Sequence, residues 1–176
     1  FIYMLFNKPI AILYIHPSYF SLIKEGSSVI EHIKVPETVV NHMTIISRAI
    51  YDDWLGNFIL QNIVKKYKLI IVLSEELVFH KELSEDKEDN KLFIERIPFQ
   101  PEQLIHKNFI IQNKAYIYVI IKDFIEQAQV SVQKSGSSIT AIIPEQLLNI
   151  HFEAQSDAHA VIQTIKKFQH IEELSM

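Results

Sequence analysis

Runs of apolar residues of strand length, separated by turn residues, open the chain. Ile10–Ile15 is almost continuously apolar and stops at His16-Pro17. Tyr19–Ile23 follows, and after a turn comes Val29–Val35, in which Val29, Ile33 and Val35 are the apolar positions. Short apolar runs bounded by Gly, Pro and Ser are typical of neighbouring strands. The opening segment therefore predicts an antiparallel meander of three strands.

The pattern then changes to a helical period. Residues 39–50 are ambiguous between strand and helix, and we expect a helix there. From Asp53 to Lys66 apolar residues recur at three- and four-residue spacing, which forms one stripe on a helix; they are Leu55, Phe58, Ile59, Ile63 and Val64. Asp52 is the expected N-cap, and the lysines at 65, 66 and 68 favour a helix C-terminus through the macrodipole.

The rest of the chain alternates strands and helices. The charged run Ser84–Lys91 predicts a solvated loop or the first turns of a helix that ends at Pro98. A second helix is expected from its cap at Asp123 to a stop at Gly136, and a third over Asp157–Phe168. The expected strands are Leu69–Leu73, Leu77–Leu83, the hairpin Leu104–Ile111 with Ala115–Ile121, and Ser138–Ile143, which Pro144-Glu145 follows as a helical turn. This order predicts an α/β or α+β fold with mixed sheets.

Composition narrows the class of protein. Of the 176 residues, 48% are hydrophobic, and 17 Lys plus Arg against 21 Asp plus Glu give a net charge of −4. A chain of this length and apolar content can bury a sizeable core, which excludes a disordered protein. The negative balance argues against a general nucleic-acid binder, and the short basic patch at residues 65–68 is too small for one. The absence of Cys excludes disulfides, thiol nucleophiles and Cys-ligated zinc.

Glycine is unusually scarce. The chain has 3 Gly, where average usage of roughly 7% would give about 12. Phosphate-binding loops depend on Gly, because its backbone can approach a phosphate closely. Neither GxGxxG nor GxxxxGK[ST] occurs in the sequence. The shortage therefore counts against a nucleotide site.

A search for catalytic and metal-binding patterns returns nothing of the right spacing. There is no HExxH or GxSxG, and the nearest histidine pair, His151 and His159, is eight residues apart. His16 is the only histidine in a position usual for an active site, at the end of a buried strand, and we interpret it as a strand terminus. We predict no catalytic residue, no metal and no cofactor. The longest apolar runs have strand length, so we expect a soluble intracellular chain with no membrane span.

The stretch from Leu69 to Ile143 carries a more distinctive pattern. A strand pair is followed by a helix that ends in Ile97-Pro98-Phe99, then by a hairpin, a helix ending near Gly136, and a strand that runs into Pro144-Glu145. This stretch resembles the actin-like PilM family of type IV pilus assembly proteins, relatives of FtsA and of the cytoplasmic part of GspL. The resemblance implies an actin-like (ribonuclease H-like) core subdomain at 1–76 and 138–176. It also implies an inserted strand-helix-strand-strand subdomain at 77–137.

The same resemblance bears on nucleotide binding. In this family the turn of the first hairpin reads Asp-Ile-Gly followed by Ser or Thr, and it binds a nucleotide phosphate. Here Tyr14, His16, Pro17 and Ser18 occupy that position. Tyr cannot replace a carboxylate beside a metal-bound water, and Pro17 removes a backbone donor. We therefore expect a degenerate phosphate loop and no bound nucleotide.

The resemblance implies a non-enzymatic scaffold, cytoplasmic and attached to the inner membrane through a partner. The scaffold would bind the cytoplasmic tail of an inner-membrane pilus protein, and it could form a homo-oligomer. An extended tail can add to exposed sheet edges, and Phe79, His80, Ile97 and Phe99 are the candidate partner-binding residues near the subdomain junction. Two alternatives stay open: a fragment of an actin-like ATPase or kinase, and an unrelated α/β subunit of a protein complex.

Overall fold

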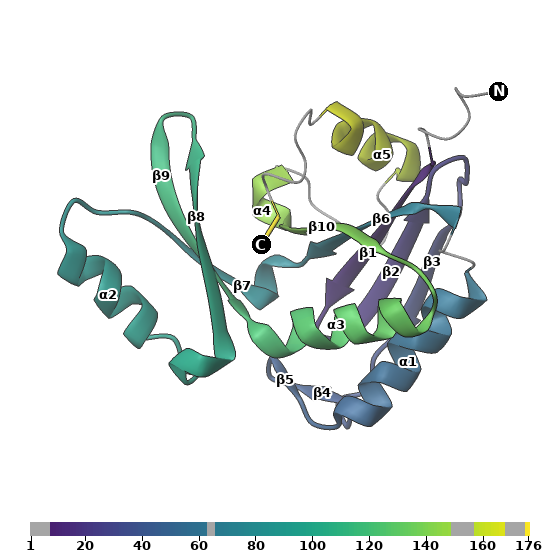
Figure 1. Cartoon of the computed structure of the whole chain (residues 1–176), viewed down its shortest axis with the longest axis horizontal. Coiled ribbons are helices and arrows are strands. Elements are labelled where there is room, and N and C mark those ends of the chain that lie inside the picture. Colours follow the sequence, from purple (N-terminus) through teal and green to yellow (C-terminus); the bar gives the residue numbers. More distant parts are fainter. Residues whose placement is uncertain (1–7, 63–65, 149–156, 168–174) are drawn as a thin grey trace.

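The described part of the chain forms a five-stranded sheet, a three-stranded sheet, a two-stranded ribbon and the helices that pack on them (Figure 1). The computed structural model describes residues 8–62, 66–148, 157–167 and 175–176. The larger sheet has helices on both faces, and the smaller sheet stands beside it with one helix of its own. The mixed α/β class predicted from the sequence is confirmed.

The larger sheet has five strands in the order β10-β6-β1-β2-β3. The first three strands pair antiparallel as the predicted meander, whereas β6 runs parallel to β1 and β10 runs parallel to β6. The parallel strands therefore end at the same edge of the sheet. The strand bounds are β1 Ile10–His16, β2 Tyr19–Lys24, β3 Ile30–Lys34, β6 Lys68–Leu73 and β10 Ile139–Pro144.

Both faces of this sheet are buried, which explains the nearly continuous apolar runs of its strands. Leu13 and its alternate neighbours in β1 enter the core under α1 (Arg48–Gln61) and α3 (Lys122–Lys134). Ile12 and Tyr14 enter a second core with α5 (Ala158–Lys167) on the opposite face. Figure 1 shows α1 and α3 together on one side of the sheet and α5 on the other.

The smaller sheet has the order β7-β9-β8, all antiparallel, with bounds β7 Val78–Glu82, β8 Leu104–Ile111 and β9 Lys114–Ile121. Gln112 and Asn113 connect β8 and β9 with φ of 49° and 64°, the left-handed pair of a tight hairpin turn, which confirms the predicted hairpin. Ile117 and Val119 form a small core on one face of this sheet. The helix α2 (Lys87–Glu95) covers that face, and Asp86 accepts the Glu88 N–H as its N-cap.

The division into 1–76 with 138–176 and 77–137 stays a prediction. The helix α3 falls in the second range, yet it packs on α1 of the larger unit. Three side-chain contacts join the two helices: Arg48 to Asp123 at 2.6 Å, and Asp52 to both Ser131 at 3.1 Å and Lys134 at 3.2 Å. In the described part of the chain, the small sheet starts with β7 and ends with β9, and α3 follows it.

The expected helix over 39–50 is wrong. The segment forms a short hairpin of β4 (Val40–Asn41) and β5 (Thr44–Ile45), with His42 and Met43 in the left-handed turn. Val40 and Ile45 are buried against the core below α1. A tight ribbon can bury these side chains while Ser47, whose Oγ accepts the Ile50 N–H at 3.4 Å, caps the helix that follows.

Both aspartates predicted as N-caps lie inside their helices. The helix α1 starts at Arg48 and α3 at Lys122, so Asp52 and Asp123 are free to bond across the α1–α3 contact. Each aspartate therefore accepts from side chains of the neighbouring helix instead of capping its own helix. The helix α1 ends at Gln61, Lys68 begins β6, and Lys65 lies outside the described residues.

The remaining predicted boundaries are close to the observed ones. Gly136 has φ of +72° directly after α3, as expected of a C-terminal stop. Glu145–Leu148 forms the short helix α4 after β10. None of the helices in the described ranges combines the length and apolar character needed to cross a bilayer.

Gly56 tests the helix α1. It lies in the helix interior, and a Cβ at this position would meet no atom within 4 Å. We expect Gly56→Ala to raise the free energy of unfolding by about 0.5–1 kcal/mol, because Gly costs that much in a helix. Urea denaturation measures the change. The control Gly136→Ala, at a left-handed φ, should lower stability, and a loss for Gly56→Ala would contradict the prediction.

Glu25 tests how α5 is attached to the sheet. Its carboxylate pairs with Lys166 of α5 and accepts the Ile10 N–H at 2.9 Å, and these bonds hold the pKa of Glu25 below its usual value of 4.5. A lowered folded-state pKa gives stability that is present above pH 4.5 and is lost as the pH falls further. We expect Glu25→Gln to cost about 0.5 kcal/mol at pH 7, as for a partly exposed pair.

Urea denaturation of wild type and Glu25→Gln at pH 7 and pH 3 measures this difference, which should shrink at the lower pH. The same pair of proteins in a Lys166→Met background is the control, because there the cost should be smaller. A difference that stays constant across both pH values would refute the role of the Glu25 carboxylate.

Candidate functional site

The carboxyl ends of β1, β6 and β10 meet at one edge of the larger sheet. The β1–β2 turn, Ser74 after β6, and Glu145 after β10 come together here. In open sheets with parallel strands, ligands bind outside these ends. We call this set of residues the carboxyl edge, and it contains the predicted phosphate-loop positions.

A buried carboxylate occupies the middle of the carboxyl edge. Glu145 is only 5% exposed and accepts a hydrogen bond from the Tyr14 hydroxyl at 2.9 Å and from the Glu75 N–H at 3.2 Å. Burial, then the charge of Glu145 and the bond to it, raise the pKa of Tyr14 far above its usual value. Tyr14 is therefore a protonated donor to Glu145 at every physiological pH.

His16 closes the β1–β2 turn from inside. Its Nδ1 accepts the Ser18 N–H at 3.1 Å and lies 2.9 Å from Ser18 Oγ. Since Nδ1 accepts, the proton of the neutral ring is on Nε2, which lies 3.3 Å from Oε2 of Glu76. The Ser18 N–H, which a phosphate loop would present to an anion, is thus bonded to the imidazole of His16.

Aromatic rings cover the same turn. The ring of Tyr19 stacks on His16 at 4.3 Å between centroids, and on its other side lies His32 at 4.7 Å. His32 is held in turn by Ser21, whose Oγ is 3.0 Å from its Nδ1. Burial raises the pKa of Tyr19. The rings thus pack beside a turn that contains no glycine.

The carboxyl edge is acidic and aromatic. A phosphate placed there would meet Glu145 and Glu76, and the hydrogen bonds and ion pairs of this edge between described residues include no Lys or Arg. In the described ranges no group of three His, Asp or Glu side chains could hold a metal ion. The two carboxylates give this edge a negative local charge.

The four predicted partner-binding residues do not come together. Phe79, Ile97 and Phe99 pack in the small core under α2, where Phe79 and Phe99 lie 6.5 Å apart. His80 is exposed on the opposite face of the small sheet and stacks on Tyr118 at 5.3 Å and 13°. Successive side chains of a strand point to opposite faces of the sheet. Phe79 and His80 are neighbours in β7 and therefore lie on opposite faces.

Two important residues were missed by the sequence reasoning. Glu145 was expected only to open a helical turn, although a carboxylate directly after a buried parallel strand is itself a signal of an edge position. Lys107 was one polar residue in a predicted strand, and nothing local indicates that its Nζ contacts residue 175.

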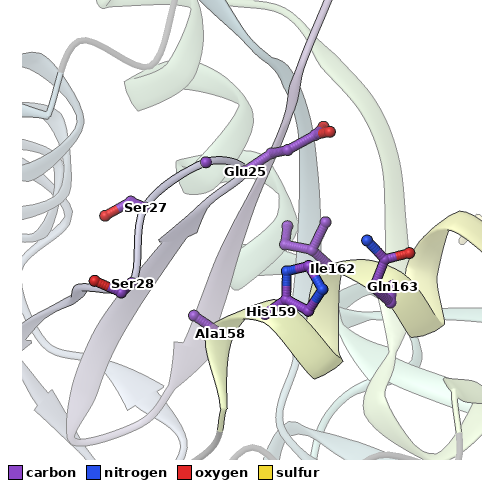
Figure 2. Close-up of a pocket in the computed structure, with 8 residues that line it drawn as sticks. Glu25, Ser27, Ser28, Ala158, His159, Ile162 and Gln163 are labelled. Carbon is purple, nitrogen blue, oxygen red and sulfur yellow. The ribbon is translucent and has the colours of Figure 1, made fainter.

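Figure 2 shows an open pocket of about 410 Å³ between the β2–β3 turn and α5. Ser27 and Ser28 line one side of it, and His159 and Gln163 the other. Glu25 also lines it, but its carboxylate is already bonded to Lys166 and Ile10. The pocket lies at the end of β2 near the start of β1, away from the carboxyl edge.

The sequence matches no protein-family model, and no curated protein is significantly similar to it. Solved structures do match its fold. A chain of a PilM–PilN type IV pilus biogenesis complex is 12% identical with a TM-score of 0.53, covering 79% of this chain and 48% of that one. The cytoplasmic domain of EpsL, an inner-membrane component of the type II secretion system of Vibrio cholerae, is 10% identical with a TM-score of 0.52.

The EpsL match covers 82% of this chain and 60% of that one. A Bacteroides thetaiotaomicron protein with an actin-like ATPase fold and unknown function is 12% identical with a TM-score of 0.50, covering 80% and 53%. This chain thus spans about half to three fifths of the length of these structures. The predicted likeness to PilM and its relatives is confirmed at the level of the fold, which is actin-like.

Two buried tyrosines give a matched test of the carboxyl edge. Tyr14→Phe leaves Glu145 without one of its donors, and we expect a loss of about 1–3 kcal/mol in the free energy of unfolding. The hydroxyl of Tyr51 is buried with no hydrogen-bond partner among the described residues. Tyr51→Phe should therefore be neutral or stabilising by up to about 1 kcal/mol. Urea denaturation at pH 7 measures both, and a Tyr14→Phe protein as stable as wild type would contradict this account.

Proposed function

We propose that the chain is a non-enzymatic scaffold of a type IV pilus or related secretion assembly, and that it binds no nucleotide. The observation that carries the proposal is the buried Tyr14–Glu145 pair. It stands where nucleotide-binding members of the resembled family hold a phosphate. The fold shared with PilM and with EpsL supports the class of assembly.

The partner in this proposal is the cytoplasmic tail of an inner-membrane protein. PilM was solved in a PilM–PilN complex, and EpsL is described as an inner-membrane component. Cytoplasmic segments next to a membrane span are rich in Lys and Arg, and the net charge of −4 favours such a segment electrostatically. The scaffold would lie in the cytoplasm and reach the inner membrane through that partner.

The proposed contact face is the side of the small sheet opposite α2. His80 is exposed there and stacks on Tyr118, which is itself buried and meets the buried Phe109 edge to face at 5.4 Å. Aromatic residues with a polar end are favoured at interfaces, because they bury large area at low entropy cost. Of the four residues predicted from the sequence, His80 is the one placed for this role.

Titration calorimetry with a synthetic tail peptide tests the proposal. The peptide is the cytoplasmic tail of the bitopic inner-membrane protein encoded beside the gene. We expect saturable binding that His80→Ala weakens about fivefold. Leu92→Ala, on the exposed side of α2, is the matched control and should leave the affinity unchanged.

A thermal-shift titration with MgATP separates the scaffold from an actin-like ATPase. No change in Tm is expected, since the carboxyl edge repels phosphate. A rise in Tm with MgATP that Glu145→Gln enhances, or no binding of the tail peptide at high concentration, would count against the proposed function.

A further inference from the structure

A segment distant in the sequence lies along the edge of β10 that faces away from β6. β10 pairs with β6 on one side only. On its other side, the Ile142 N–H donates to Ser175 Oγ at 2.9 Å, and the Met176 N–H donates to the Ile142 carbonyl at 2.8 Å. Both outward groups of Ile142 are therefore satisfied by two residues far away in the sequence.

The same two residues also contact the small sheet. Lys107 of β8 donates from Nζ to the Ser175 carbonyl at 2.5 Å, and this Nζ lies 5.1 Å from the centroid of the Phe109 ring. Met176 is half-buried and packs against the large core. Ser175–Met176, which we call the strap, thus connects β10 of the large sheet to β8 of the small one.

We infer that the strap occupies the acceptor site for an extended partner segment, so that a partner binds by displacing it. This inference rests on the proposed function and specifies where on the scaffold the tail pairs. The Ile142 carbonyl accepts a main-chain N–H, the Lys107 ammonium donates to a main-chain carbonyl, and the Ile142 N–H donates to the Ser175 hydroxyl, so the site offers both an acceptor and donors to an extended segment. Main-chain pairing at a sheet edge gives affinity with little regard to side chains, so any extended tail with an apolar residue at the Met176 position fits.

The contacts make displacement feasible. Between described residues, the hydrogen bonds that hold the strap are donated by Ile142, Met176 and Lys107. A competing internal segment lowers the apparent affinity of a partner by the fraction of molecules in which the site is free. Weakening the strap should therefore raise partner affinity, whereas an ordinary stabilising contact would have no such effect.

The experiment uses the full chain with Ser175→Ala, which removes the Oγ acceptor, and with Met176→Pro, which removes the N–H donor. The probe is the synthetic tail peptide of the proposed function. We expect each variant to bind it about five- to tenfold more tightly than wild type. Ser27→Ala, a serine on the β2–β3 turn, is the matched control and should bind like wild type.

A methyl NMR spectrum gives a direct view of the strap, because the chain has only three methionines. With ¹³C-methyl methionine, the Met176 signal of wild type should move toward its position in Ser175→Ala as the tail peptide saturates the site. Equal affinity of wild type and both strap variants, or an unmoved Met176 signal at saturation, overturns the inference while leaving tail binding intact.

If the tail peptide binds none of the proteins, the proposed function fails and a second probe decides the inference. This probe is a synthetic peptide with the sequence of residues 170–176, added in trans. Tighter binding to Ser175→Ala and Met176→Pro than to wild type supports the acceptor site at β10. Equal binding, or none, overturns it.

Discussion

The strand β1 buries side chains on both of its faces, and the rest of the structure depends on this double burial. Leu13 and Ile15 enter the core under α1 and α3, while Ile12 and Tyr14 enter the core under α5. A strand buried on both faces needs a neighbour on each side and a helix layer above and below. The meander with β2, the parallel strand β6 and the helices on both faces in Figure 1 meet that requirement.

Parallel pairing has a second consequence, which concerns the site. Because β1, β6 and β10 run in one direction, the residues that follow them gather at one edge. In this chain that edge holds Tyr14, Glu145 and the turn closed by His16. A carboxylate is buried there with its own donors, so the electrostatic preference of the edge is opposite to that of a phosphate site.

The small sheet shows how the two units are joined. Its face under α2 is filled by Ile97, Ile117 and Val119, while on its other face His80 is exposed and Tyr118 is buried in the large core. Ser175 and Met176 contact both β10 and Lys107. The two sheets also share one hydrophobic core, since Val78, Tyr118 and Ile120 of the small sheet are buried in the same cluster as Leu13 and Ile15 of β1.

The sequence by itself determined the strands of the five- and three-stranded sheets and most helices, because hydrophobic period and turn residues act locally; the β4–β5 ribbon was missed. The β8–β9 hairpin and the stop at Gly136 follow from Gln112, Asn113 and glycine conformations that neighbours do not alter. Only the tertiary structure decided the roles of Asp52 and Asp123, which bond across α1 and α3 instead of capping. It also decided that Glu145 meets Tyr14, a contact between residues 131 positions apart. The local pattern of apolar residues indicates which face of a helix or strand is buried. The partner of a polar side chain depends on which elements the fold brings together.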